Sequence, residues 1–198
     1  EELQRDDHAS PALVVRPDGR LMVLYCGHRG RWLIYRTSER PEDVSAWGSE
    51  HAASGHTSEV WGYTYPCAFI LAAESDRRYL FWRGRDYLPT YSTSESGMEW
   101  SEPRTLIEGA GQQPYAKYAS DGVRTIHMAF TQDHPRKKDD NSVYYARYAE
   151  GAFRRADGTI IASVDSLPFA PEDADLVYDA SAEGARAWVW DVAFDDAG

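Results

Sequence analysis

Four side chains suited to proton transfer or anion binding stand at the borders of apolar segments: His8, His28, Tyr65 and Arg83. Histidine and tyrosine can accept or donate a proton when they lie within about 3 Å of the reacting atom. Arginine carries a permanently charged, planar fork that pairs with a carboxylate. His8 and Tyr65 come just before an apolar segment, and His28 and Arg83 come just after one. If these segments are equivalent strands of successive units, the four side chains face a common pocket.

Each of the four also has a purely structural interpretation. A histidine at a strand end is often a hydrogen-bonding residue of a turn, and the carboxylates of Asp6–His8 could bond loop amides. Tyr65 could pack at the start of a strand. Arg83 could form a salt bridge with either Asp86 or Glu59. Only the joint pattern favours a functional site.

Other polar clusters are weaker candidates. His134 stands near Asp139–Asn141, and these residue types can bind metal ions. Their spacing is irregular, and Arg136–Asp140 is typical of a solvated loop. The glycines of Gly109–Gly111 lack the strand-to-helix context of a phosphate loop. We therefore predict no metal site among the functional residues and no required cofactor, although a structural metal ion remains compatible with the sequence.

The charge balance excludes one class of partner. The formal net charge is −11, and the lysines and arginines are scattered apart from Arg136–Lys138. No basic stripe is available to neutralise phosphates, so we expect no nucleic-acid partner. A local basic pocket for an anionic ligand remains compatible with this charge.

No apolar run approaches the roughly 20 residues that a membrane-spanning helix needs, so we expect no membrane partner. The chain as given contains no signal peptide, yet Glu1–Asp7 leads straight into a strand pattern, and a targeting segment could have been removed. The sequence therefore leaves the localisation open, with a secreted or periplasmic protein as the suspected case. Cys26 and Cys67 stand at the ends of apolar runs in neighbouring units, which favours buried thiols over a disulfide.

The elements that must position these residues are strands. Aromatic residues make up 13% of the chain, and its apolar runs are short and interrupted by Gly, Pro, Asp and Ser, which is typical of all-β proteins. Three segments share a strand–turn–strand pattern and each predicts a hairpin. They begin about 50 residues apart, the period of a four-stranded propeller blade. The hairpins are Pro11–Cys26, Pro66–Trp82 and Pro114–Thr131.

A further strand follows each hairpin, at Trp32–Tyr35, Thr90–Thr93 and Ser142–Ala146. The second of these leads into Thr93-x-Glu95-x-Gly97-x-x-Trp100, a degenerate Asp box. In such a turn we expect the acidic side chain to bond backbone amides, the glycine to take a positive φ and the tryptophan to pack into the blade.

The sequence therefore predicts one partial β-propeller domain over residues 1–198, built of four-stranded antiparallel blades, from a ring that needs roughly as much chain again. The segment Trp188–Phe194 predicts the first strand of a fourth blade, whose partner strand is missing. Because an unpaired strand would expose its edge, we expect the remaining blades to come from a longer chain or from a second chain. The predicted blades span about 8–55, 60–108 and 112–165, with the next beginning in 186–198.

Several short sequence motifs resemble those of the BNR-repeat propeller family, which carries Asp boxes and is often labelled neuraminidase-like. The resemblance extends over almost the whole chain, and the motifs follow one another in the order expected for the family. The motifs are Asp6-Asp7-His8-x-Ser10-Pro11-Ala12-Leu13, Gly27-His28 followed by Tyr35-Arg36-Thr37-Ser38, Tyr63-Thr64-Tyr65-Pro66, Gln113-Pro114-Tyr115-x-Lys117-Tyr118 and Ile126-His127-x-Ala129-Phe130-Thr131.

Related by pattern are the seven-bladed ulvan lyases and other propeller enzymes that cleave rhamnose–glucuronate glycans. The resemblance therefore implies seven blades in the complete propeller. The resemblance implies catalytic roles for His8, His28, Tyr65 and Arg83, with Tyr63 as a competitor for Tyr65. Arg83 would neutralise a uronate carboxylate, Tyr65 would act as base, or as base and acid together, and the histidines would share positioning and proton transfer. Further substrate-binding candidates at the same mouth are Trp61, Tyr63, Lys117, His127 and His134.

Three functions compete on this basis. The first is a polysaccharide lyase that acts on an anionic polysaccharide or oligosaccharide by β-elimination. The second is a glycoside hydrolase, either rhamnosidase-like or sialidase-like, although the arginine triad and Tyr–Glu pair of sialidases find no full match. The third is a glycan-binding propeller without catalysis, in which aromatic residues stack on sugar rings.

Overall fold

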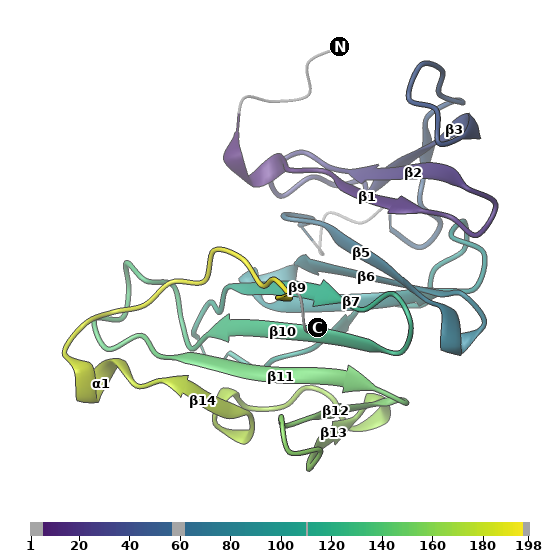
Figure 1. Ribbon diagram of the computed structural model, residues 1–198. Coiled ribbons are helices and arrows are strands. Elements are labelled where there is room, and N and C mark those ends of the chain that lie inside the picture. Colours follow the sequence, from purple (N-terminus) through teal and green to yellow (C-terminus); the bar gives the residue numbers. More distant parts are fainter. Residues whose placement is uncertain (1–5, 57–61, 110, 196–198) are drawn as a thin grey trace. The chain divides into compact units, whose positions relative to one another are not determined.

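The computed structural model describes residues 6–56, 62–109 and 111–195. The first antiparallel sheet has the strand order β1-β2-β3-β4, preceded by a 3-10 turn, η1 (Asp7–Ala9). The β1–β2 hairpin closes where Asp18 accepts a hydrogen bond from the backbone of Arg20 at 3.1 Å. The strands are β1 (Ala12–Val15), β2 (Arg20–Tyr25), β3 (Ile34–Pro41) and β4 (His51–Ala52) (Figure 1).

The second sheet has the order β5-β6-β7-β8. Strand β6 is buried along almost its whole length, as expected for a central strand covered on both faces. The elements are β5 (Cys67–Leu71), η3 (Ala72–Glu74), β6 (Arg77–Arg83), η4 (Arg85–Tyr87), β7 (Pro89–Ser94) and β8 (Arg104–Thr105). The hairpin predicted at Pro66–Trp82 and the strand predicted at Thr90–Thr93 are therefore confirmed.

The Asp-box turn after β7 forms, but its acidic residue has a different role from the one predicted. Gly97 takes the expected positive φ of 82°, and Trp100 packs against the core as a partly buried residue. The amide of Gly97 donates to the hydroxyl of Ser94 at 2.7 Å. Glu95 instead points outward and forms an ion pair with Arg77 at 2.8 Å. The shorter hydroxyl side chain, which stands at the start of the turn, takes the role that we predicted for the carboxylate.

The third sheet departs from the plain four-stranded pattern at its outer side. Its strands follow the order β13-β12-β11-β10-β9, and β14 also pairs with β11. Strand β12 pairs with the C-terminal half of β11, and β14 pairs with the N-terminal half. The elements are β9 (Ala116–Ser120), β10 (Thr125–Thr131), β11 (Val143–Ala149), β12 (Ala152–Arg154), β13 (Ile160–Ser163), η5 (Val164–Ser166), η6 (Pro171–Asp173), β14 (Asp175–Tyr178) and α1 (Ala180–Glu183).

The strand predicted at Trp188–Phe194 does not form. These residues belong to no strand, because no segment in the described part of the chain pairs with them along its length. A strand pattern alone cannot create a strand, since the backbone groups need a neighbouring strand as hydrogen-bond partner.

The chain divides into two compact units, and each has its own buried core. The first comprises residues up to 85 with 90–103, and the second comprises 86–89 with residues from 104 onward. The first core draws alternate residues from β2, Met22 and Leu24, together with Leu80 and Trp82 of β6. The second contains the aromatic group Phe130, Phe153 and Phe169. The assignment of residues 1–198 to a single domain remains a prediction.

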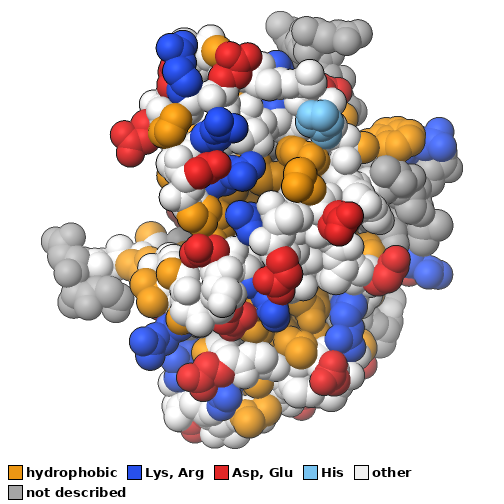
Figure 2. Space-filling model, turned by 90° about the vertical axis from the view of Figure 1, so that its right-hand side faces the viewer, with side chains coloured by type: hydrophobic (Ala, Val, Ile, Leu, Met, Phe, Trp, Pro, Cys, Tyr) orange, Lys and Arg blue, Asp and Glu red, His pale blue; other side chains and the backbone are white. Residues whose placement is uncertain are grey.

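The surface shown in Figure 2 carries acidic and basic side chains interspersed, without a broad patch of one sign. Within the described ranges no helix is long and apolar enough to cross a membrane. Cys26 is buried and Cys67 is half-buried, and neither forms a disulfide. Burial raises the pKa of the Cys26 thiol to about 12, as expected for an inert packing residue.

Candidate functional site

Three chain segments of the first unit meet at one place: the η1 turn, the turn after β2 at residues 27–30, and the segment 63–65 before β5. Gly30 and Tyr63 exchange backbone hydrogen bonds of 3.2 and 3.1 Å, and the amide of Arg29 donates to the hydroxyl of Thr64 at 3.0 Å. The amide of Tyr65 donates to the carbonyl of His8 at 3.2 Å. Residues far apart in the sequence are thus joined through the backbone, which is a rigid way to position side chains.

The turn that carries His28 requires glycine at position 30. A Cβ atom there would lie 2.9 Å from the carbonyl oxygen and 3.0 Å from the nitrogen of Gly27. These are backbone atoms of the same tight turn, so they cannot move aside cheaply. The glycine therefore lets the chain fold closely beneath His28.

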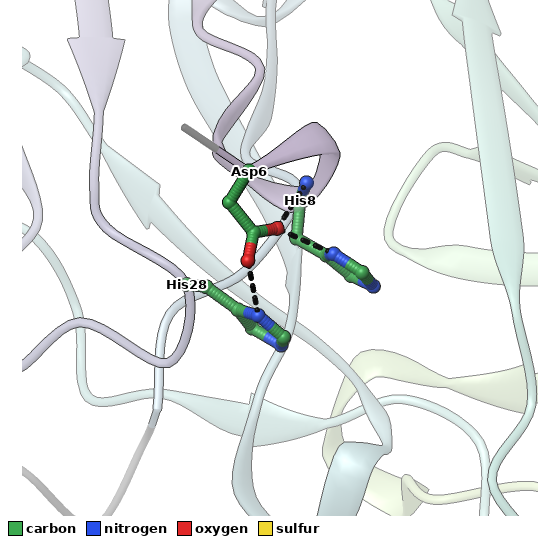
Figure 3. Close-up of side chains that lie close together, drawn as sticks. All are labelled: Asp6, His8 and His28. Atoms are coloured by element: carbon green, nitrogen blue, oxygen red, sulfur yellow. Dashed lines mark hydrogen bonds and ion pairs between the residues drawn. The ribbon is translucent and has the colours of Figure 1, made fainter. Parts of the chain in front are cut away.

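A single carboxylate joins the two predicted histidines. Asp6 accepts from the backbone amide of His8 at 2.8 Å and lies 2.6 Å from the Nδ1 atom of the same residue. Its second oxygen lies 3.0 Å from Nδ1 of His28. Figure 3 shows both rings extending from the carboxylate in the same direction. This arrangement, which we name the Asp6 cluster, comprises Asp6, His8 and His28.

Ring contacts place Tyr65 beside the Asp6 cluster. The imidazoles of His8 and His28 stack with centroids 4.1 Å apart and an interplanar angle of 5°. The ring of Tyr65 lies 5.0 Å from that of His8. Tyr65 adopts a left-handed φ of 54°, which is rare for a non-glycine residue and is common at functional sites. The side chains of His8 and His28 are 25% and 29% exposed, so both can be reached from solvent.

Hydrogen bonds to Asp6 fix its charge. They lower the pKa of the carboxyl to about 2, chiefly through the backbone amide of His8, with further contributions from the rings of His28 and His8. Asp6 is therefore a carboxylate near neutral pH. A carboxylate can only accept hydrogen bonds, so the Nδ1 atoms that face it carry protons.

The Asp6 cluster is also the group in the described ranges whose donor atoms could hold a metal ion. The parallel rings do not favour this, since nitrogen lone pairs that run side by side do not converge on one tetrahedral centre. The loop of Asp139–Asn141 contains no such group in the structure: Asp139 pairs with Arg186 and Asp140 with Lys138. Asn141 is fully buried and bonds the backbone of Asp133.

The remaining candidates of the first unit divide into three cases. Arg83 is buried, and its amide donates to the carbonyl of Thr64 at 2.8 Å, next to Tyr65. Tyr63 is fully buried between His56 and Trp82, and its contact with substrate remains a prediction. The backbone pairing with Gly30 turns its side chain into the core. Trp61 and Glu59, the predicted alternative partner of Arg83, lie outside the described residues.

Three predicted binding residues belong to the second unit. His127 on β10 bonds the hydroxyl of Tyr145 on β11 at 2.7 Å, and both line a pocket of about 360 Å³ with Val192–Asp195. His134 accepts from the amide of Arg136 through Nδ1 at 3.0 Å, a turn contact. Lys117 is half-buried on β9. Substrate binding by His127, His134 and Lys117 remains a prediction.

Sequence reasoning included a bond from Asp6 to a loop amide, as seen with the amide of His8, but missed the contacts of Asp6 with the two imidazoles. An aspartate two residues before a histidine can accept that residue's amide in a short turn, and this local signal was visible. The second contact, to His28 across 22 residues, depends on the fold. Also missed was His56, a fully buried histidine whose pKa burial lowers to about 4.

Comparisons with solved structures show that the fold is a known one. An ulvan lyase, a polysaccharide lyase solved bound to -[GlcA(1-4)Rha3S]-, aligns with a TM-score of 0.66 at 18% identity, covering 85% of this chain and 44% of the lyase. An exo-1,5-α-L-arabinanase from a bovine ruminal metagenomic library gives 0.54 at 14%, covering 85% and 59%. The polysaccharide lyase Uly1 gives 0.52 at 15%, covering 85% and 49%.

The chain thus spans about half the length of these structures. No curated protein matches it. The family described as "BNR repeat-containing family member" matches over residues 1–198. The predicted all-β fold of antiparallel propeller blades is confirmed. The chain belongs to the BNR repeat family.

Proposed function

We propose that this protein is a carbohydrate-active enzyme that cleaves a uronate-containing polysaccharide by β-elimination. The observation that carries the proposal is the joint position of His8, His28 and Tyr65: two imidazoles and a phenol within 5.0 Å ring contacts, held by backbone bonds from three segments. The ulvan lyase and Uly1 structures, which share the fold, support the choice of substrate class.

Elimination across C4–C5 of a uronate makes three chemical demands. The carboxylate must be neutralised so that the C5 proton becomes acidic, the proton must be removed, and the leaving oxygen must be protonated. The C4–O bond then breaks and a C4=C5 double bond forms. Each demand needs a group within hydrogen-bond reach of the reacting atom.

Arg83 takes the first role, because a guanidinium remains charged and matches the two oxygens of a carboxylate. Tyr65 takes the second role as base and can return the proton to the leaving oxygen. The histidines position the sugar and take part in proton transfer through Nε2, since Nδ1 of each ring faces Asp6. Burial of Arg83 strengthens its attraction for an anionic sugar.

A hydrolase is the second candidate, favoured by the arabinanase fold match. Most glycosidases need two carboxyl groups placed to act as acid and as base or nucleophile. In the Asp6 cluster the one carboxylate is engaged by two imidazoles and holds a pKa of about 2, so it is unsuited to donate a proton. This chemistry therefore favours elimination over hydrolysis.

The test is ultraviolet absorbance during incubation of the full-length protein with a panel of uronate polysaccharides that includes ulvan. Elimination creates an unsaturated uronate that absorbs, so we expect a rising signal. New reducing ends without absorbance would instead establish a hydrolase. Binding to the polysaccharides without either product would establish a binding propeller.

A further inference from the structure

We infer that Asp6 is a positioning residue that fixes both His8 and His28 in the Nδ1–H tautomer, so that each ring directs an acceptor Nε2 away from the carboxylate. The catalytic meaning of this role rests on the proposed function. The tautomers themselves can be tested without any substrate.

The argument begins with the hydrogen-bonding capacity of a carboxylate. Asp6 offers only acceptors, and its two oxygens lie 2.6 and 3.0 Å from the Nδ1 atoms of His8 and His28. Two nitrogen atoms that both face an acceptor at these distances must both be protonated. A neutral imidazole with a proton on Nδ1 has its acceptor on Nε2.

Stacking then gives the two rings one orientation. With an interplanar angle of 5° and both Nδ1 atoms at the same carboxylate, the opposite ring edges lie side by side, as Figure 3 shows. The ring of Tyr65 contacts His8 at 5.0 Å. The carboxylate on one side of the cluster thus sets which nitrogen of each ring accepts a proton on the other side.

Asp6 also has a local structural role, which must be separated from the positioning role. It caps η1 by accepting from the amide of His8 at 2.8 Å. Asparagine can keep this cap through its side-chain oxygen. It cannot serve both imidazoles as aspartate does, because its NH₂ group donates. In Asp6→Asn the ring that faces this NH₂ must accept at Nδ1 and carry its proton on Nε2.

The experiment is long-range ¹H–¹⁵N NMR of the full-length protein labelled with ¹⁵N-histidine, at a pH where the rings are neutral. Cross-peak patterns distinguish the two tautomers, and His8→Gln and His28→Gln assign the signals. We expect Nδ1–H for both rings in the wild type and a switch of one ring to Nε2–H in Asp6→Asn. The matched control is Asp43→Asn, because Asp43 likewise accepts from an amide two residues on, that of Ser45 at 2.7 Å. It should leave both patterns unchanged.

Three results would overturn the inference: an Nε2–H tautomer for either ring in the wild type, unchanged tautomers in Asp6→Asn, or a wild-type spectrum altered by a metal chelator, which would place an ion in the cluster. The wild-type spectrum decides the matter even if the variant fails to fold. If a substrate is cleaved, kcat of Asp6→Asn should fall at least about 10²-fold, in line with the large losses that follow a tautomer change in a catalytic triad. Absence of cleavage by the wild type would count against the proposed function alone.

Discussion

The two units each pair a histidine with a tyrosine, and they do so in different surroundings. The ring of His8 lies 5.0 Å from Tyr65 at 38°, and that of His127 lies 6.0 Å from Tyr145 at 39°. In the first pair the histidine Nδ1 faces the carboxylate of Asp6 at 2.6 Å. In the second pair it faces the tyrosine hydroxyl itself at 2.7 Å. Similar ring contacts thus accompany different partners for the same nitrogen.

The difference decides what each histidine can do. Burial, with a smaller contribution from Arg147, lowers the pKa of His127, and burial raises the pKa of Tyr145. Both groups are therefore neutral near pH 7 and satisfy each other. In the first unit the Nδ1 atom of His8 faces the carboxylate of Asp6 and not the hydroxyl of Tyr65. Of the two similar residue pairs, only the first has a carboxylate as the partner of the histidine Nδ1.

The largest expected effect follows directly from this contrast. Removing one hydroxyl from each pair compares them with the same chemical change. Tyr65→Phe should lower the rate of polysaccharide cleavage by about 10²–10⁴-fold, since it deletes the proposed base. Tyr145→Phe should change the rate less than about threefold. The initial rate of increase in ultraviolet absorbance would measure both effects. Equal losses of activity in the two variants would show that the two tyrosines do not differ in their importance for cleavage.

His56 provides the next effect, and it concerns stability in the first unit. Burial lowers its pKa in the folded protein to about 4, below the ordinary value of 6.5. The unfolded chain therefore binds a proton more readily than the folded protein does. The resulting stability is fully present above about pH 6.5 and is lost as the pH falls toward 4, by up to about 3 kcal/mol.

Urea unfolding between pH 4 and 7 would measure this loss. In His56→Gln the free energy of unfolding should vary less with pH than in the wild type, although packing loss lowers its value throughout. Carboxyl groups also titrate in this range, but they are the same in both proteins, so their contribution to the pH dependence cancels in the comparison. An identical pH dependence in the two proteins would show that His56 is protonated without cost in the fold.

Local pattern was enough to predict much of the fold. Turn chemistry at Asp18 and Gly19, and alternating burial at Met22 and Leu24, are encoded within a few residues, and these strands form as expected. The segment Trp188–Phe194 has an equally good strand pattern and forms no strand, because pairing depends on a distant partner. Local pattern thus fails where the deciding contact is remote.

The candidate site follows the same logic. The family resemblance indicated His8, His28 and Tyr65, their positions at strand ends predicted a common pocket, and the structure brings them together. Tyr63 and Tyr65 could not be separated from sequence, since the difference lies in the backbone pairing of Tyr63 with Gly30. Burial of Tyr63 is a consequence of that pairing across more than thirty residues.

A smaller effect is expected from the turn that carries His28. Gly30→Ala would place a methyl group against the backbone of Gly27, with contacts of 2.9 and 3.0 Å, and should destabilise the protein by about 1–3 kcal/mol. Gly122→Ala, in a hairpin turn of the second unit, meets no atom within 4 Å but keeps a strained φ of 69°, so it should cost about 1 kcal/mol. Urea unfolding measures both. Only Gly30→Ala should also lower activity. Equal activity in both variants would show that the turn at Gly30 does not position the catalytic side chains.

The smallest effect tests the second pair by its charge environment. Arg147 stands opposite His127 across β10 and β11 and contributes to the lowered pKa of that histidine. Because a positive neighbour disfavours the protonated imidazole, Arg147→Gln should raise the pKa of His127, while burial keeps it below the ordinary value. Arg104→Gln, which removes an exposed arginine paired with Asp165 in the same unit, should leave it unchanged. NMR titration of the His127 ring measures both. If the pKa of His127 rises to the ordinary value in Arg147→Gln, the charge of Arg147, and not burial, keeps this imidazole neutral. The difference between His127 and His8, which faces a carboxylate, would then be a difference in neighbouring charge alone.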